Sequence, residues 1–323
     1  MIWLTWRQHR QQALFTALAL AALAALMVPT GLHMRGVFDD SGLASCLDKA
    51  GTAPLVPQGT DTCDALRDQF VSPFGGTMLL AILFVLLPLL VGLFFGAPLV
   101  AREIESGTHR MVWTQGVSRR QWVLAKTGLL GTAALLLAVV YALGVTWWFA
   151  PMAASSTGRL AYGYFDVQGI VPIGYTLFAL ALGVFAGTVC RKVLPAMAVT
   201  LGGFTVVRLG IELLARPHYL PGKTLSYGVQ STEGYNPASG VWASSTGVYD
   251  AGGKLVSNGF VGCSPGSAGD ACVQEMGGPD SYNQLVYQPG DRFWIFQGIE
   301  TGIFLALTAL LLYLTIRRIR RIA

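Results

Sequence analysis

The side chains that could carry enzyme chemistry do not assemble into a site. The chain has four histidines: His9, His33, His109 and His218. All four fall in loops or at the ends of hydrophobic runs, so they cannot form a buried catalytic set or a metal centre. The string Gly222, Lys223, Thr224 resembles the end of a phosphate-binding loop, but that motif needs a glycine where Pro217 stands. We therefore predict a chain that is not an enzyme and has no metal site or nucleotide site.

A second polar stretch, residues 101–126 (AREIESGTHRMVWTQGVSRRQWVLAK), lies between the hydrophobic runs 77–100 and 123–150. Residues 102–105 can continue the preceding helix, and Gly107 can end it in the left-handed conformation that glycine adopts easily. Ser118 and Gln121 have the spacing of a capping box at the start of the next helix. The stretch is suited to receive a push from a soluble partner. The alternative is a solvated connector whose charges only set topology.

Three charged residues lie inside hydrophobic runs. Arg208 and Glu212 are one helical turn apart, and Glu300 lies about two turns into a later run. A charge at the centre of a membrane helix costs up to ~2.5–3.5 kcal/mol, so these side chains should face other helices and form pairs. One hypothesis is a polar gate or substrate contact along an export path. The other is a structural tie between Arg208 and either Glu300 or Glu212.

Composition places the chain among membrane proteins. Of its 323 residues, 53% are hydrophobic and 12% are charged, and the mean hydropathy is +0.53. We predict an all-α polytopic membrane protein with six transmembrane helices, an N-terminal interfacial helix and two extracytoplasmic segments. An N-terminal signal peptide is the alternative for the first run, but no convincing small-residue cleavage site follows it.

The expected elements follow from the hydrophobic runs and the residues between them. They are an interfacial helix (1–12), the spans 13–32, 77–100, 123–150, 169–189, 193–214 and 293–316, the extracellular segments 33–76, 151–168 and 215–292, the cytoplasmic segments 101–122 and 190–192, and a basic tail (317–323). With both termini cytoplasmic, that side carries 13 Lys and Arg against two Glu, whereas the other side carries eight against 13 Asp and Glu. This bias sets the orientation, and it makes nucleic-acid binding an unnecessary explanation of the basic pI of about 9.0.

The outer segments carry two signals of structure. Cys46 and Cys63 fall in the first segment and Cys263 and Cys272 in the second, whereas Cys190 falls on the inner side. This partition fits two local disulfides, each worth roughly 2–4 kcal/mol, and the alternative is four unpaired thiols. In the second segment, residues 241–249 and 254–261 flank Asp250–Gly253, a pattern that predicts a β-hairpin.

The polar stretch also resembles a known family. Glu103, Glu105, Gly107 and Thr108, followed by Ser118, Arg119 and Lys126 after a helix ending APLVARE, resemble the cytoplasmic loop of ABC-2 type transporter permeases. The resemblance is closest to permeases of high-GC Gram-positive bacteria, which similarly open with a Trp-rich, Arg-containing leader and close with an Arg cluster. It covers the membrane-spanning frame but not the extracellular segments.

The resemblance implies a multi-pass permease of the bacterial plasma membrane. A separate cytoplasmic ATPase would bind ATP and Mg, with no cofactor in this chain, and the other partners would be membrane lipid and a second copy or a related permease. The residues implied to couple to the ATPase are Arg102, Glu103, Glu105, Gly107, Thr108, His109 and Arg110. Glu103 and Glu105 would pair with basic residues of the ATPase. A hypothesis of another class is a non-transporting scaffold or sensor whose extracellular segments bind a ligand.

Overall fold

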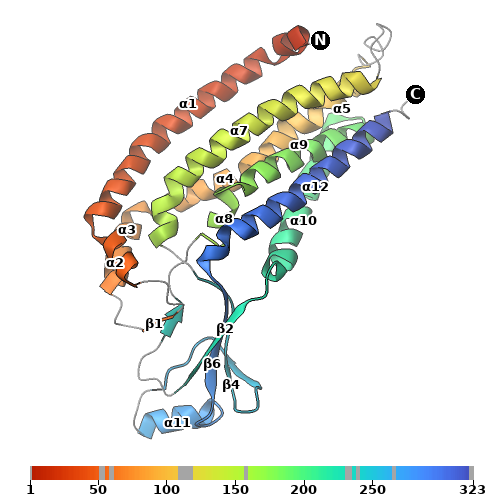
Figure 1. Ribbon diagram of the computed structural model, residues 1–323. Helices are drawn as coiled ribbons and strands as arrows, with labels where there is room; N and C mark the ends of the chain where they lie inside the picture. Colours follow the sequence, from red (N-terminus) through yellow and green to blue (C-terminus); the bar gives the residue numbers. More distant parts are fainter. Residues whose placement is uncertain are drawn as a thin grey trace.

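The computed structural model describes residues 2–50, 55–57, 62–107, 119–155, 159–229, 235–237, 241–263 and 267–319. Long helices lie side by side in a bundle, and a small β-sheet projects from one end of it (Figure 1). Both chain termini lie at the opposite end. We refer to these as the sheet end and the termini end.

The helices of the described residues are α1 (Ile2–Asp40), α2 (Leu43–Ala50), α3 (Thr62–Phe74), α4 (Thr77–Val91), α5 (Ala97–Glu105), α7 (Arg119–Ser155), α8 (Tyr164–Val167), α9 (Val171–Cys190), α10 (Val193–Gly210), α11 (Ser267–Glu275) and α12 (Phe293–Ile319). Two π-helical turns, η1 (Gly92–Gly96) and η2 (Ile211–Ala215), and two 3-10 turns, η3 (Arg216–His218) and η4 (Gly290–Arg292), extend them. Within this part of the chain, six stretches are long and apolar enough to cross a membrane: Ala17–Asp40, Ile82–Glu105, Leu124–Ser155, Val171–Cys190, Val193–His218 and Gly290–Ile319. Each corresponds to one of the six predicted spans, which indicates a multi-pass membrane protein.

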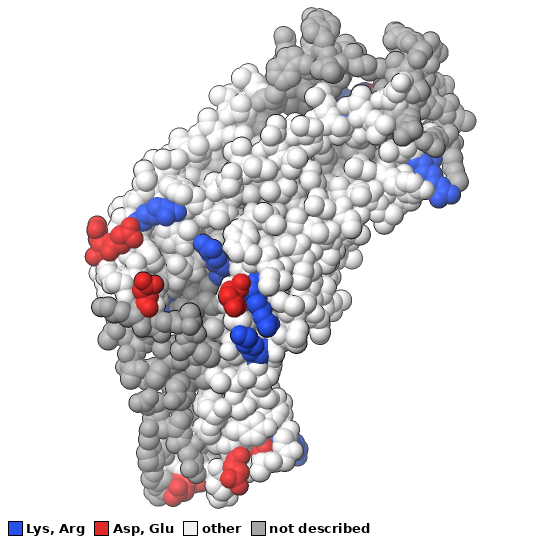
Figure 2. Space-filling model, in the orientation of Figure 1, with Lys and Arg blue, Asp and Glu red and all other residues white. Residues whose placement is uncertain are grey.

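The distribution of charged residues agrees with these membrane spans. On the face drawn in Figure 2, the middle of the helical part is white, and Lys, Arg, Asp and Glu lie toward its two ends and on the sheet. An uncharged middle between charged ends is what a hydrocarbon layer of about 30 Å requires.

The N-terminal helix differs from expectation. Instead of an interfacial helix over residues 1–12 followed by a separate span, α1 runs without a break from Ile2 to Asp40. No glycine or proline occurs between Ile2 and Val28, and the helix continues past Pro29 although proline lacks the N–H for one of its hydrogen bonds. The first outer segment is also more helical than expected, because α1 extends into it and α2 and α3 follow. A disulfide between Cys46 and Cys63, with Cα atoms 5.8 Å apart, joins α2 to α3.

Helix α9 is the centre of the bundle. Of its residues, 67% are buried, against 17% for the spans of α1 and α10. Glycines permit this burial, because a Cβ on Gly183 would lie 2.5 Å from the Gly92 carbonyl oxygen and a Cβ on Gly187 would lie 2.8 Å from that of Ala97. The backbone of α9 therefore packs directly on η1 and α5. Such small-residue contacts replace the hydrophobic effect as the attraction between helices in lipid.

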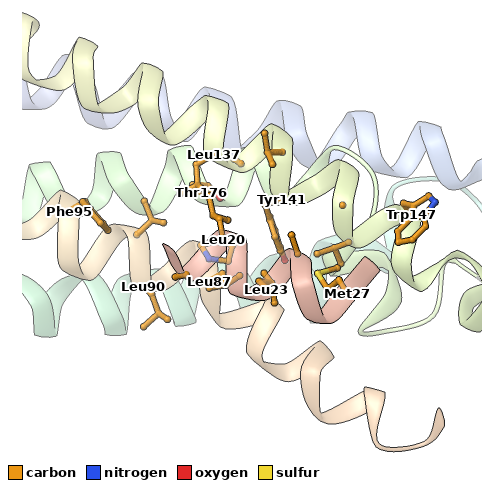
Figure 3. A pocket seen from close by; sticks show the side chains of 18 of the residues that line it. Leu20, Leu23, Met27, Leu87, Leu90, Phe95, Leu137, Tyr141, Trp147 and Thr176 are labelled. Atoms are coloured by element: carbon orange, nitrogen blue, oxygen red, sulfur yellow. The ribbon is translucent and has the colours of Figure 1, made fainter. Parts of the chain in front are cut away.

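Helix α1 packs more loosely. It approaches α7 closely at Gly31, where a Cβ would lie 2.7 Å from the Trp147 ring and 2.8 Å from the Trp148 ring. Further toward the termini end, a cavity remains between α1, α4, η1 and α7 (Figure 3).

The strands are β1 (Leu55–Pro57), β2 (Lys223–Gly228), β3 (Tyr235–Pro237), β4 (Trp242–Tyr249), β5 (Leu255–Asn258) and β6 (Tyr282–Gln288). β4 and β5 form the predicted hairpin, and the Asp250 side chain accepts a hydrogen bond from the Lys254 N–H in its turn. The hairpin is only half of an antiparallel sheet of order β2-β6-β4-β5, so the expected small hairpin was too limited. A second disulfide, Cys263–Cys272, reaches α11.

We predict that Gly183→Ala lowers the thermal unfolding midpoint of the purified chain, because the added Cβ overlaps the η1 backbone and overpacking costs about 1–3 kcal/mol. Gly202→Ala is the matched control, since a Cβ at Gly202 meets no atom within 4 Å and alanine improves helix propensity by about 1 kcal/mol. Equal midpoints for the two variants in detergent would contradict this account of α9.

Candidate functional site

The polar stretch 101–126, called the loop below, begins at the termini end with the last turn of α5, which forms the base of the loop. The helix ends at Glu105, the Ser106 N–H bonds to the Arg102 carbonyl at 3.0 Å, and Gly107 has φ +73°. The predicted helix end and left-handed glycine are therefore confirmed. Thr108, His109, Arg110 and the capping residue Ser118 lie outside the described residues.

Glu103 and Lys126 join two sides of the loop. The Lys126 ammonium forms an ion pair with the Glu103 carboxylate, and both side chains are largely buried. Because Glu103 lies on α5 and Lys126 on α7, this ion pair connects the helix before the loop to the helix after it.

Glu105 reaches a third helix. Its carboxylate oxygen Oε2 accepts a hydrogen bond of 3.0 Å from the backbone N–H of Val193, the first residue of α10. The first N–H groups of a helix have no partner within it, and a carboxylate there also meets the positive end of the helix dipole. Glu105 therefore caps α10 from outside. Both glutamates thus have partners within the chain, and their expected pairing with the ATPase stays a prediction.

Apart from Glu105, the exposed charges near this base are basic among the described residues. Arg102 points outward, as do Arg191 and Lys192 in the turn between α9 and α10, and Arg317 and Arg318 at the end of α12. Arg191 adopts a left-handed conformation, φ 57°, which closes this turn in two residues. The termini end thus presents positive charge around the loop.

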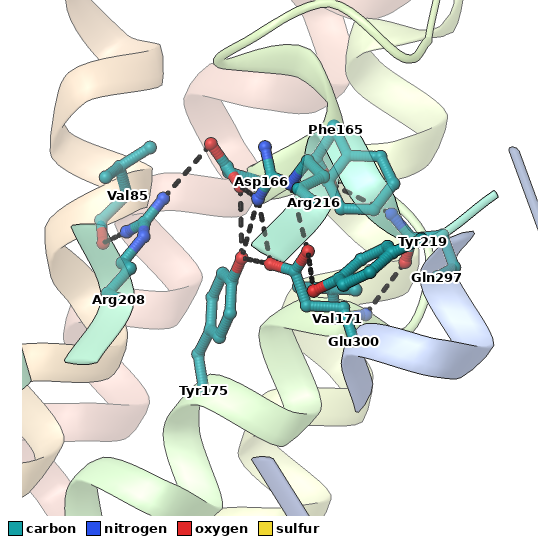
Figure 4. A network of polar contacts seen from close by, with 10 residues as sticks. All are labelled: Val85, Phe165, Asp166, Val171, Tyr175, Arg208, Arg216, Tyr219, Gln297 and Glu300. Atoms are coloured by element: carbon teal, nitrogen blue, oxygen red, sulfur yellow. Dashed lines mark hydrogen bonds and ion pairs between the residues drawn. The ribbon is translucent and has the colours of Figure 1, made fainter. Parts of the chain in front are cut away.

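A second polar site lies at the sheet end, inside the bundle (Figure 4). It holds two arginines and two acids that are each no more than 7% exposed: Asp166, Arg208, Arg216 and Glu300. They come from α8, α10, η3 and α12. The charges balance, and balance is required because an unpaired buried charge is very costly.

Arg216 is the centre of this cluster. Its Nε and Nη2 atoms bond to the two Glu300 oxygens at 2.9 and 2.8 Å, and Nη2 also lies 2.6 Å from Asp166 Oδ1. The guanidinium stacks on the Phe165 ring with a centroid distance of 4.4 Å. A planar fork with several donors suits this bridging role better than a lysine would.

The aromatic hydroxyls and Arg208 complete the cluster. The Tyr175 hydroxyl hydrogen-bonds Glu300 and lies 3.0 Å from Asp166, and the Tyr219 hydroxyl donates to Glu300 at 3.1 Å. Arg208 lies 3.2 Å from the other Asp166 oxygen and donates to the Val85 carbonyl at 3.2 Å.

A π-helical turn aligns the two arginines. Arg208 and Arg216 are eight residues apart, and η2 lies between them. Since a π turn holds one extra residue, the separation acts as about seven residues, which returns a helix to within about 20° of the same face. Both guanidiniums consequently reach Asp166.

The ion pairs predicted for the buried charges were wrong. Glu300 pairs with Arg216, not with Arg208, and Arg208 pairs with Asp166. Glu212 is partly buried beside the cluster but takes part in none of the ion pairs among the described residues. The sequence interpretation missed Asp166, Tyr175 and Arg216. The recurrence of charge at 208, 212 and 216 was the available signal.

Gln297 attaches the same region to α12. Its side-chain oxygen accepts hydrogen bonds of 2.9 Å from the N–H groups of Ile170 and Val171, and its Nε2 donates to the Phe165 carbonyl at 3.0 Å. One amide thus caps the start of α9 and fixes the α8 segment that carries Asp166. Gly169, with φ +69°, leaves room for it, since a Cβ there would lie 2.6 Å from the Gln297 oxygen.

Comparison with known protein families identifies the family of this chain. Residues 17–216 match the family described as ABC-2 membrane transporter related. The chain belongs to the ABC-2 membrane transporter related family. Comparisons with curated proteins and with solved structures found no match. The family match does not distinguish the permeases of high-GC Gram-positive bacteria from others.

The matched region of this ABC-2 family chain contains the loop base and ends at Arg216. Members of the family are typically permeases without a nucleotide-binding domain. Glu300, Gln297 and the sheet lie beyond residue 216. The buried cluster therefore joins the family region to the part of the chain outside it.

The charges of the cluster act on two groups that lie outside the spans. Burial raises the pKa of the Asp166 carboxyl, but Arg216 and Arg208 more than offset it and hold this pKa below its ordinary value. Burial, followed by the charge of Glu300, raises the pKa of the Tyr219 phenol. Asp166 is thus ionised and Tyr219 protonated at neutral pH.

We predict that Arg216→Ala destabilises this ABC-2 family chain by about 3–5 kcal/mol, because it leaves Asp166 and Glu300 buried without their shared partner. Removing one of those acids as well, in Arg216→Ala with Glu300→Gln, should recover part of the loss. Unfolding in detergent measures both. The exposed Lys223→Ala serves as control, and a loss for Arg216→Ala no larger than the control's would contradict the bridging role.

The lowered Asp166 pKa predicts a pH dependence. A carboxylate with a depressed pKa stabilises the fold above its ordinary pKa of 3.8 and loses that contribution as pH falls toward its folded value. The unfolding midpoint of the wild type should therefore exceed that of Asp166→Asn at neutral pH. The difference should narrow below about pH 4. A difference that stays constant from pH 7 to 3 would rule out this linkage.

Proposed function

We propose that this chain is the transmembrane permease subunit of an ATP-driven ABC exporter. Family membership and six long apolar helices support this proposal. A separate cytoplasmic subunit binds ATP and Mg and hydrolyses the nucleotide. A second permease, either another copy of this chain or a relative, completes the translocation path.

The proposed orientation places the termini end in the cytoplasm of a bacterial plasma membrane. The exposed Arg102, Arg191, Lys192, Arg317 and Arg318 at that end follow the positive-inside rule. The disulfides at the sheet end suit an oxidising exterior. Residues 101–126 then face the ATPase.

Helix α10 carries the coupling proposal, because it is bonded directly to the loop base at one end and to the buried cluster at the other. Its first N–H is capped by Glu105 at the loop base, and its other end supplies Arg208 and continues into Arg216. The continuous stretch Val193–His218 has 26 residues and is about 39 Å long at 1.5 Å per residue. A shift of the loop would thus reach the outer cluster through one rigid rod.

In this mechanism the cluster is the closed outer latch. Asp166, Tyr175 and Glu300 hold α10 and η3 against α8, α9 and α12. ATPase closure pushes the loop, and Glu105 and the Glu103–Lys126 pair pass the movement to α10 and α7. Movement of α10 pulls Arg208 and Arg216 together away from the carboxylates of the cluster, which opens the outer side of the translocation path.

The test uses Glu105 and co-expression with the ABC ATPase encoded nearest to this chain. Glu105→Ala removes the acceptor for the Val193 N–H, whereas Glu105→Gln keeps an acceptor and removes the charge. We expect Glu105→Ala to co-purify with the ATPase but to lose at least half of its stimulated ATP hydrolysis in lipid. Glu105→Gln should retain hydrolysis. Glu275→Ala, an exposed change on α11, is the control.

Other outcomes redirect the proposal. If Glu105→Ala and Glu105→Gln both dissociate the complex, Glu105 binds the ATPase directly and does not couple through α10. If the wild-type chain binds no ATPase, the exporter role fails. The sheet that continues directly into α12 would then favour a membrane scaffold or sensor.

A further inference from the structure

The cavity beside α1 is separate from both polar sites. It has a volume of about 500 Å³, within the range of about 300–1,000 Å³ that is usual for ligand pockets. It is lined chiefly by residues of three helices, among them Leu23 and Met27 of α1, Leu87 and Leu90 of α4, and Leu137 and Tyr141 of α7 (Figure 3). All three helices are candidate membrane spans, so the cavity lies at the depth of the hydrocarbon layer.

The lining selects an aliphatic ligand. Among the described residues, no charged side chain lines the cavity, and its two hydroxyls are already engaged within the chain. Tyr141 donates to the Phe84 carbonyl at 2.8 Å, and Thr176 donates to the Pro172 carbonyl at 2.8 Å. The walls thus offer chiefly dispersion contacts, and neither hydroxyl is free to anchor a ligand. Val140 and Phe94 on the rim are 61% and 57% exposed, so the cavity opens on the face that meets lipid.

A cation stands at the end of the cavity nearest the sheet. Trp147 lines that end, and the Arg35 guanidinium packs over the Trp147 ring with a centroid distance of 4.9 Å. Arg35 also donates to the Trp147 carbonyl. Among the described residues no carboxylate forms an ion pair with it. Arg35 lies two turns beyond Val28, the last α1 residue of the lining, and five residues before the end of the candidate span Ala17–Asp40, from where a long basic side chain can reach the headgroup layer.

We propose that this cavity binds a membrane phospholipid, with one acyl chain between α1, α4 and α7 and the phosphate on Arg35. The apolar walls accept the chain, and the cation beside Trp147 complements the phosphate, as guanidinium groups commonly do. A bound chain fills the space that the loose packing of α1 leaves. The proposal requires only that the sheet end of the bundle lies at a membrane surface. It stands whether or not the chain is an exporter.

The experiment fills the cavity from one position. Gly144 lines it, and a Cβ there meets no atom within 4 Å, so Gly144→Phe places a ring in the space without displacing the helices. Gly128→Phe is the matched control on the same helix, because a Cβ at Gly128 is equally free and the residue does not line the cavity. Arg35→Gln tests the headgroup contact. The full chain is equilibrated with vesicles of equal parts phosphatidylglycerol and phosphatidylcholine, extracted in detergent, and its retained lipid counted by native mass spectrometry.

We expect the wild type and Gly128→Phe to retain one phospholipid per chain, chiefly phosphatidylglycerol. Gly144→Phe should retain roughly tenfold less, and Arg35→Gln should lose roughly tenfold in preference for phosphatidylglycerol, which is the effect of one charged hydrogen bond. Size-exclusion profiles matching the wild type show that the variants are folded.

Equal retention by Gly144→Phe and Gly128→Phe would overturn the proposal. So would retention of added hexadecanol in place of phospholipid, which would make the cavity a site for lipophiles without a headgroup. If Gly144→Phe fails to fold, Ala24→Phe on α1 fills the same cavity from the opposite wall. Undiminished phospholipid in that variant overturns the proposal equally.

Discussion

The bridge that Arg216 makes between Asp166 and Glu300 is the constraint on which the arrangement of the sheet end depends. Each carboxylate is almost fully buried, where an unpaired polar or charged group is very costly. One guanidinium bridges both, which fixes α8 against α12 at the point where the chain leaves α10 for the sheet. Because β6 leads through η4 directly into α12, the sheet inherits that position.

The two halves of the bundle differ in how they are held. Around α9 the contacts are backbone to backbone, through Gly92, Gly183 and Gly187, and they leave no room for adjustment. Around α1 they are side chain to side chain, with an aromatic cluster of Phe84, Trp148 and Phe149 near the sheet end and a cavity beyond it. Close backbone contacts transmit a displacement from one helix to the next, whereas contacts between flexible side chains can absorb it. The division suits a molecule in which α10 moves against a fixed α9 and α12.

Local chemistry explains which features could be predicted from the sequence. Gly107, the Asp250–Gly253 turn and the six spans depend on neighbouring residues or on hydrophobic length, and all were found. The cysteine pairs followed from their partition between segments. The cap of α10 by Glu105 could not be found, because it joins residues 88 apart in the chain. The pairing of β2 with β6 could not be predicted for the same reason, since no local pattern specifies a partner some 60 residues away.

Arg216 illustrates a different limit. Apolar residues end at Leu214, so hydropathy alone assigns Arg216 to the outer segment and counts it as a solvent-exposed charge. The π turn at Ile211–Ala215 changes this, since it rotates Arg216 onto the face of Arg208 and into the bundle, where it is 1% exposed. A π turn widens the helix and is poorly stable alone, so it persists where surrounding contacts require it. Here the two carboxylates supply that requirement. The charge cluster and the irregular helix are thus two parts of one solution: the acids need both arginines, and only an extra residue in the turn brings both to them.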